Sequence, residues 1–141
     1  MTLSDHVEGV AEGRRGVLVQ RQKDRSVWRI EEGGKVWFAK RGLTPKRRRE
    51  IRREAENARA LEAAGLGAKV LAAGEHASGQ WIVTEWAGCS PREFLMALAA
   101  ETVPRELLDD IAALVRSLHD RGWAYPELTE EHVRIGPQGR L

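Results

Sequence analysis

The pair Gly33-Gly34 constrains the fold more than any other feature of the sequence. It separates two runs of strand-forming residues, 26–30 and 35–40. Two glycines between such runs are typical of a two-residue hairpin turn, because that turn requires positive φ angles. A third strand-like run at residues 16–19 comes before them, so the sequence predicts three antiparallel strands in meander order.

A helix is predicted directly after the third strand. Thr44 can cap its first turn, Pro45 suits its first helical position, and Gly65 can end it. Apolar residues recur at helical spacing and predict a buried stripe: Ile51, Ala55, Ala58 and Leu61. Residues 70–73 and 80–85 then have the pattern of two more strands.

The second half of the sequence is mainly helical. Ser90-Pro91-Arg92-Glu93 is a capping box that predicts a short helix to about Ala100. A longer helix is predicted from about Pro104 until Gly122, with an apolar face between residues 107 and 118. A loop and a short strand at residues 133–135 follow. Because the strands gather in the first half, the sequence predicts the α+β class.

Composition excludes several classes of protein. Of the 141 residues, 42% are hydrophobic and 31% are charged, which suits a compact domain with a core. One cysteine, Cys89, excludes an internal disulfide and a cysteine-rich zinc site. The polar start contains no signal core, and no run approaches the roughly 20 apolar residues of a membrane span. We therefore expect a cytoplasmic protein, with peripheral contact to the inner membrane left open through its basic residues.

Lys40 is the first residue with chemical interest. It ends an otherwise apolar strand, where an ammonium group needs a carboxylate or an anionic ligand. A solvated strand end is the simpler interpretation. Glu54 in the following helix lies next to the buried stripe and is a candidate partner, while Glu56 is its competitor. A lysine held by a helix glutamate and directed at phosphate oxygens is an arrangement used in phosphoryl transfer.

A basic run occupies the start of the same helix, at Lys46–Arg49 with Arg52 and Arg53. Such a run is usually a solvated face. Cations at a helix N-terminus oppose the macrodipole, however, so an anionic partner such as a lipid, a lipopolysaccharide phosphate or a nucleic acid is the alternative. The run contains no aromatic residue for base stacking, which weakens the nucleic acid alternative.

Residues 118–133 contain the second constellation, Leu-His-Asp-Arg-Gly-Trp-Ala-Tyr-Pro-Glu-Leu-Thr-Glu-Glu-His-Val. This segment resembles the entry into the catalytic loop of protein-kinase-like enzymes. Glu127 stands at the place of the catalytic Asp, and His132, five residues later, stands at the place of the Asn. The sequence resembles most closely the lipopolysaccharide core (Kdo/heptose) kinases, in which a histidine at the Asn place is familiar. Atypical kinases of the Bud32/RIO type are second closest.

The resemblance implies a division of the chain. Residues 1–15 would be a flexible lead-in. Residues 16–87 would form a protein-kinase-like N-lobe, with a five-stranded antiparallel sheet and helix C. Residues 88–141 would contain the first helices of a truncated C-lobe, which we expect to end before the Asp-Phe-Gly position.

The resemblance also implies an ATP site. Lys40 and Glu54 would position phosphates, and Thr84 would be the gatekeeper beside the adenine. The backbone from Glu85 to Ala87 would meet the adenine itself.

Catalytic roles follow from the same resemblance. Glu127 would orient or deprotonate the acceptor hydroxyl, and His132 would support the catalytic loop or serve as a weak ligand of Mg²⁺. The expected reaction is the ATP-dependent phosphorylation of a sugar or lipopolysaccharide core hydroxyl.

Several residues depart from the pattern of an active kinase. The connection at residues 20–25 contains no glycine, Phe38 replaces a small residue, and Glu127 replaces an aspartate. The Asp-Phe-Gly segment that holds the catalytic metal is absent. A non-catalytic, pseudokinase-type binding module and a Bud32/RIO-like fragment are therefore alternatives to a sugar kinase. The apolar helix face at residues 107–118 needs a partner, which a homo-oligomer would supply.

Overall fold

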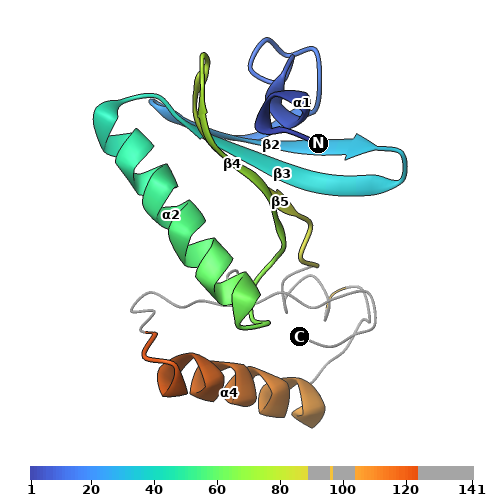
Figure 1. Cartoon of the computed structure of the whole chain (residues 1–141). Helices are drawn as coiled ribbons and strands as arrows, with labels where there is room; N and C mark the ends of the chain where they lie inside the picture. The colour runs from blue at the N-terminus through green and yellow to red at the C-terminus, as the bar shows by residue number, and fades with distance from the viewer. Residues whose placement is uncertain (89–95, 97–103, 124–141) are drawn as a thin grey trace. The chain divides into compact units, whose positions relative to one another are not determined.

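The computed structural model describes residues 1–88, 96 and 104–123, which are drawn in colour in Figure 1. The chain divides into two compact units, Met1–Trp86 and Ala87–Leu141. The first unit contains seven of the described elements: α1 (Leu3–Val7), β1 (Val17–Gln22), β2 (Arg25–Glu32), β3 (Lys35–Gly42), α2 (Pro45–Ala63), β4 (Val70–His76) and β5 (Gly79–Glu85).

The five strands form one antiparallel sheet in the order β1-β2-β3-β5-β4. Gly33 and Gly34 make the turn between β2 and β3, with φ angles of 59° and 76°. Both angles lie in the left-handed region that glycine adopts without strain, and Glu32 pairs with Lys35 across the turn. The predicted α+β fold with a five-stranded antiparallel sheet is confirmed.

Helix α2 covers one face of the sheet. Thr44 caps it by accepting a hydrogen bond from the amide of Arg47 at 3.3 Å. Ile51 and Ala55 are buried against Ile82 of β5, as helical spacing predicts for residues on one side of the helix. We call this side of the sheet the α2 face.

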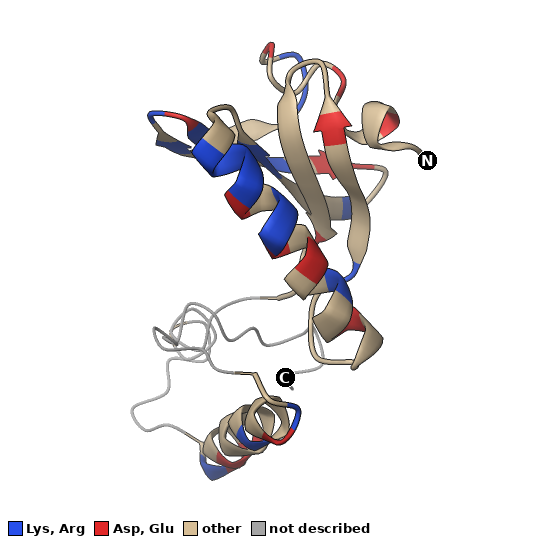
Figure 2. Cartoon of the chain, turned by 60° about the vertical axis from the view of Figure 1, so that its left-hand side comes forward, with Lys and Arg blue, Asp and Glu red and all other residues tan. Residues whose placement is uncertain are grey.

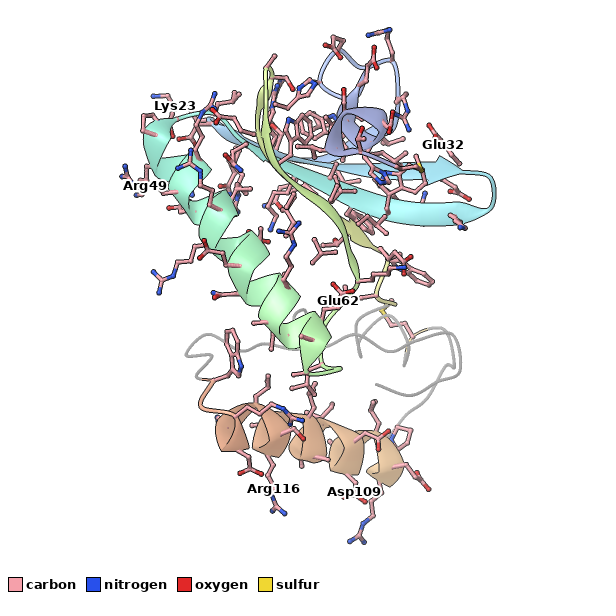
Figure 3. All side chains as sticks on the ribbon, viewed as in Figure 1. Lys23, Glu32, Arg49, Glu62, Asp109 and Arg116 are labelled. Carbon is pink, nitrogen blue, oxygen red and sulfur yellow. The ribbon has the colours of Figure 1, made fainter. Side chains whose placement is uncertain are left out.

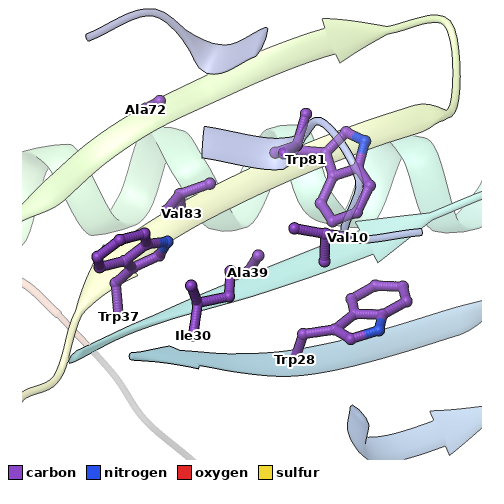
Figure 4. Packing of buried hydrophobic residues seen from close by; sticks show 9 residues of the cluster. Val10, Trp28, Ile30, Trp37, Ala39, Ala72, Trp81 and Val83 are labelled. Atoms are coloured by element: carbon purple, nitrogen blue, oxygen red, sulfur yellow. The ribbon is translucent and has the colours of Figure 1, made fainter. Parts of the chain in front are cut away.

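The opposite side of the sheet contains the larger core. Side chains alternate between the two faces of a strand, so the neighbours of the α2-face residues point away from α2. Three indoles dominate this second side, and Figure 4 shows them with α2 running behind the strands. We call it the tryptophan face: Trp28, Ile30, Trp37, Ala39, Trp81 and Val83, all buried.

Residues 1–15 are not a lead-in separate from the core, so this part of the sequence prediction is wrong. Helix α1 and the turn after it place Val7 and Val10 on the tryptophan face, with exposed fractions of 1% and 0%. Thr2 and Asp5 form a capping box at the start of α1. Arg15 then holds the segment, because its guanidinium donates to Glu32 at 2.8 Å and to the carbonyl oxygen of Asp5 at 2.9 Å.

In the second unit the structure describes α4 (Arg105–Asp120), which follows Pro104 and is followed by Gly122 at φ 78°. Its apolar residues differ in exposure, since Leu107 is buried and Leu108 is 52% exposed. The helix predicted after Ser90 and the strand predicted at 133–135 lie outside the described residues. No helix within the described residues is long and apolar enough to span a membrane.

Candidate functional site

An ion pair joins β3 to α2. Lys40 Nζ lies 2.5 Å from Glu54 Oε1, and the two side chains are 27% and 41% exposed. Lys40 belongs to the α2 face because its cross-strand partner there is Ile82. The predicted contact is therefore present, whereas the competing Glu56 is exposed to solvent.

Phe38 and Thr84 lie on the same face of the sheet as this pair. Phe38 lies two residues before Lys40, on the same face of β3. Its cross-strand partner in β5 is Thr84, which places Thr84 on the α2 face as well. Phe38 and Thr84 thus share the α2 face with the ion pair, and the gatekeeper role of Thr84 stays a prediction.

The segment predicted to contact adenine begins at Glu85, the last residue of β5, and its first two amides are hydrogen-bonded within the first unit. The amide of Glu85 donates to the carbonyl oxygen of Lys69 at 3.0 Å, and the amide of Trp86 donates to that of Val36 at 3.1 Å. Ala87 is exposed, and its amide makes no main-chain hydrogen bond to another described residue. Of the three predicted adenine-contacting residues, Ala87 is the one whose amide remains available within the described part of the chain.

The connection between β1 and β2 is shorter than the sequence suggested. The predicted six-residue connection is a turn of two residues, Lys23 and Asp24, because residues 20–22 continue β1. Asp24 accepts hydrogen bonds from the hydroxyl of Thr44 at 2.9 Å and from Arg47 Nε at 3.0 Å. The bonds from Arg47 and Thr44 hold the pKa of Asp24 below its ordinary value.

These contacts attach the tip of the β1–β2 hairpin to the first turn of α2. Figure 3 shows Lys23 at this tip, near the N-terminal end of the helix. Sequence reasoning missed the attachment, since it weighed the turn only for glycine. The pairing of one acidic turn residue, Asp24, with the basic start of the helix was the signal that could have revealed it.

The comparison with known families agrees with this geometry. The family model of the phosphotransferase enzyme family matches residues 17–138. The chain belongs to the phosphotransferase enzyme family. This family is part of the protein-kinase-like superfamily, so the five-stranded sheet with α2 is its N-lobe. No curated protein matches the chain.

Within this phosphotransferase-family N-lobe, α2 carries a concentration of cations, shown in blue in Figure 2. Some of them are paired: Arg47 contacts Asp24 and Glu50, and Arg48 contacts Glu75 at 3.2 Å. Others are exposed to solvent on the outer side of the helix: Lys46, Arg49 and Arg53. Arg52 donates to Gln80 Oε1 of β5 at 3.1 Å, so the run divides into arginines that bond the hairpin tip or the strands and cations that face solvent.

The two catalytic residues predicted for this phosphotransferase-family chain, Glu127 and His132, lie outside the described residues. Among the described residues no group of three His, Cys, Asp or Glu side chains could hold a metal ion. The described part of the site therefore consists of the lysine–glutamate pair with Phe38 and Thr84 on the same face of the sheet.

Proposed function

We propose that the chain takes part in ATP-dependent phosphoryl transfer to a sugar hydroxyl, as in the lipopolysaccharide core kinases that its sequence resembles. The observation that carries the proposal is the ion pair between Lys40 and Glu54 on the α2 face. A family of phosphotransferases provides the reaction class, and the ion pair provides the group that would receive a phosphate.

In this proposal Lys40 binds the phosphates of ATP. An ammonium group has three donors, and one of them is directed at Glu54. The remaining donors would bind phosphate oxygens, while Glu54 fixes the direction of the side chain. Thr84 and Phe38 would bound the adenine ring, and the amide of Ala87 would bind its edge.

The catalytic roles in this proposal rest on the resemblance. Glu127 would accept the proton of the sugar hydroxyl as the oxygen attacks phosphorus. His132 would support the loop that carries Glu127. Mg²⁺ prefers carboxylate and phosphate oxygens, so His132 alone would be a weak ligand and the phosphates of ATP would supply most of the coordination.

The exposed cations of α2 support an anionic acceptor. Lys46, Arg49 and Arg53 would contact an anionic surface, such as the phosphates of a lipopolysaccharide core at the inner membrane. Each such cation near an anionic surface contributes about 1 kcal/mol. The proposed place of action is therefore the cytoplasmic side of that membrane.

A second candidate is a non-catalytic nucleotide-binding or partner-binding module, and the β1–β2 hairpin supports it. In protein kinases a glycine-rich loop covers the phosphates. Here the two-residue turn contains no glycine, and Asp24 is bonded to Thr44 and Arg47. This tip would have to leave α2 before it could cover a nucleotide. A Bud32/RIO-like protein kinase fragment would share the same ATP site.

Isothermal titration of the chain with ATP and Mg²⁺ tests nucleotide binding. Lys40→Met should weaken ATP binding by about tenfold or more, because it removes a charge-assisted hydrogen bond to phosphate. Lys35→Met is the matched control, since Lys35 is an exposed lysine on the same strand. Equal binding by the two variants, or no binding by the unaltered chain, would contradict the proposal.

Turnover separates the enzyme from the non-catalytic module. ADP release is measured with Kdo-containing and heptose-containing acceptors and compared with ATP alone. The proposed sugar kinase requires acceptor-dependent ADP release that Glu127→Gln abolishes while ATP binding persists. ATP binding without acceptor-dependent release would identify the second candidate instead.

A further inference from the structure

Two arginines stand in one row across the tryptophan face. Arg21 of β1 is the cross-strand partner of Ser26 in β2, and Ser26 is in turn the partner of Arg41 in β3. Directly paired residues of an antiparallel sheet share a face, so both arginines lie on the same side with the small Ser26 between them. Lys40 precedes Arg41 and therefore points to the other side of the sheet.

Arg41 is held in place by aromatic rings. Its guanidinium carbon lies 5.2 Å from the ring centroid of Trp28 and 5.7 Å from that of Trp81. Nη1 donates to the carbonyl oxygen of Ser78 at 3.3 Å. Contact with two rings fixes the plane of a guanidinium, so its donors have a defined direction before any ligand arrives.

One donor of Arg41, its Nε, is buried and has no acceptor among the described residues. Burial is the main cause that lowers the pKa of Arg41, and the charge of Arg21 lowers it further, while Glu12 opposes them. A charged donor without an acceptor, near a second cation of the same sign, is an unfavourable arrangement that a bound anion would relieve.

We propose that Arg21 and Arg41 form a second anion site, separate from the Lys40 site, that binds a phosphate group over Ser26. A guanidinium binds two phosphate oxygens at once through two parallel N–H groups. Nε of Arg41 has no acceptor in the described part of the chain, and the exposed Arg21 supplies the second guanidinium. The occupant is a phosphate-bearing small molecule, because exposed Arg21 leaves the site open to solvent on one side.

Indole N–H signals report on this site directly, because Trp28 and Trp81 contact Arg41. The full chain labelled with ¹⁵N is titrated with inorganic phosphate at constant ionic strength, with chloride as the balancing anion. The signals of Trp28 and Trp81 should shift and saturate. Trp86, which is 47% exposed and lies after the far end of β5, should not move.

Matched variants locate the binding. Arg21→Gln removes an exposed charge, so it should leave the fold intact and weaken phosphate binding by about tenfold. Arg59→Gln removes a charge from another exposed position, on α2, and should leave binding unchanged. Lys40→Met should also leave the indole shifts unchanged, because Lys40 lies on the other face.

Four results would overturn the proposal. One is a failure of the shifts to saturate with phosphate, and another is a loss of binding in Arg59→Gln as large as in Arg21→Gln, which would indicate charge screening only. Loss of the shifts in Lys40→Met would place the phosphate at the other site. Binding of acetate as tight as that of phosphate would show that the site does not select phosphate.

Discussion

The two faces of the N-lobe sheet differ in the size of the core that they bury and in the charged groups beside it. The tryptophan face buries three indoles under α1 and the turn that follows it. The α2 face buries a smaller cluster around Ile51, Ala55 and Ile82, and beside it stands the ion pair of Lys40 and Glu54. The larger core thus lies on one side of the sheet, and the lysine–glutamate pair that we propose for ATP lies on the other.

The energies of the two faces differ accordingly. Complete burial of a large apolar side chain contributes about 1.5–3 kcal/mol, and Trp81, Ile30 and Val83 all have exposed fractions of 0%. A partly exposed ion pair contributes about 0–1 kcal/mol. The sheet that carries the ion pair is therefore stabilised mainly by the tryptophan face. Substitutions on the two faces should change the free energy of unfolding by different amounts.

The largest effect is expected at Trp81. Trp81→Ala removes a fully buried indole and should lower the free energy of unfolding by about 3–5 kcal/mol, measured by urea denaturation. Trp86→Ala is the matched control, because Trp86 is 47% exposed and its replacement should change stability by about 0.5 kcal/mol or less. Similar losses in the two variants would erase the proposed contrast between the faces.

A smaller effect is expected where the N-terminal segment meets the tryptophan face. Val10→Ala should cost about 2 kcal/mol of unfolding free energy, since it removes two buried methyl groups and leaves a cavity. Val19→Ala makes the same change at a residue of β1 that is 50% exposed, and should be nearly neutral. If both variants are neutral in urea denaturation, residues 1–15 contribute nothing to the core.

Local signals made the centre of this lobe predictable from the sequence. Gly33-Gly34 determines the β2–β3 turn, and Thr44 caps the helix that follows. Once the strand and the helix are placed, Lys40 and Glu54 are brought together by the short connection between them. Each of these inferences needs only residues that are close in sequence.

The remaining features depend on residues distant in sequence. α1 is only five residues long, so its periodicity is weak, and Val7 is recognisable as core only once the sheet beneath it exists. The bond between Asp24 and Arg47 joins positions 23 residues apart, and the row of Arg21, Ser26 and Arg41 depends on strand register. Tertiary pairing determines these contacts, and no local propensity encodes them.

The contact of α1 with the tryptophan face should depend on pH through His6. This side chain is 5% exposed and packs edge-on against Trp37 at 5.9 Å between ring centroids. Burial lowers the pKa of His6 below its ordinary value of 6.5, and the positive charges of the N-terminus and Arg15 act in the same direction, against Asp5. The unfolded chain therefore binds a proton at a higher pH than the folded chain does.

The protonation of His6 should accordingly not reduce the free energy of unfolding above pH 6.5, and should reduce it as the pH drops below that value. Thermal unfolding between pH 7.5 and 5.5 measures the slope, and His6→Phe should reduce it because an uncharged ring replaces the imidazole. His119→Gln, at an exposed position of α4, is the control that should leave the slope unchanged. A slope that His6→Phe does not alter would assign the pH dependence to other groups.

The smallest effect on stability is expected at the ion pair itself. A double-mutant cycle with Lys40→Met and Glu54→Gln should give a coupling of about 1 kcal/mol or less, because both side chains are partly exposed and solvent screens them. A coupling well above that value would mean that the pair stabilises the fold, as the tryptophan face does. A small coupling together with a large loss of ATP binding in Lys40→Met would show that the pair serves ligand binding. A pair that serves stability would instead give a large coupling and little loss of ATP binding.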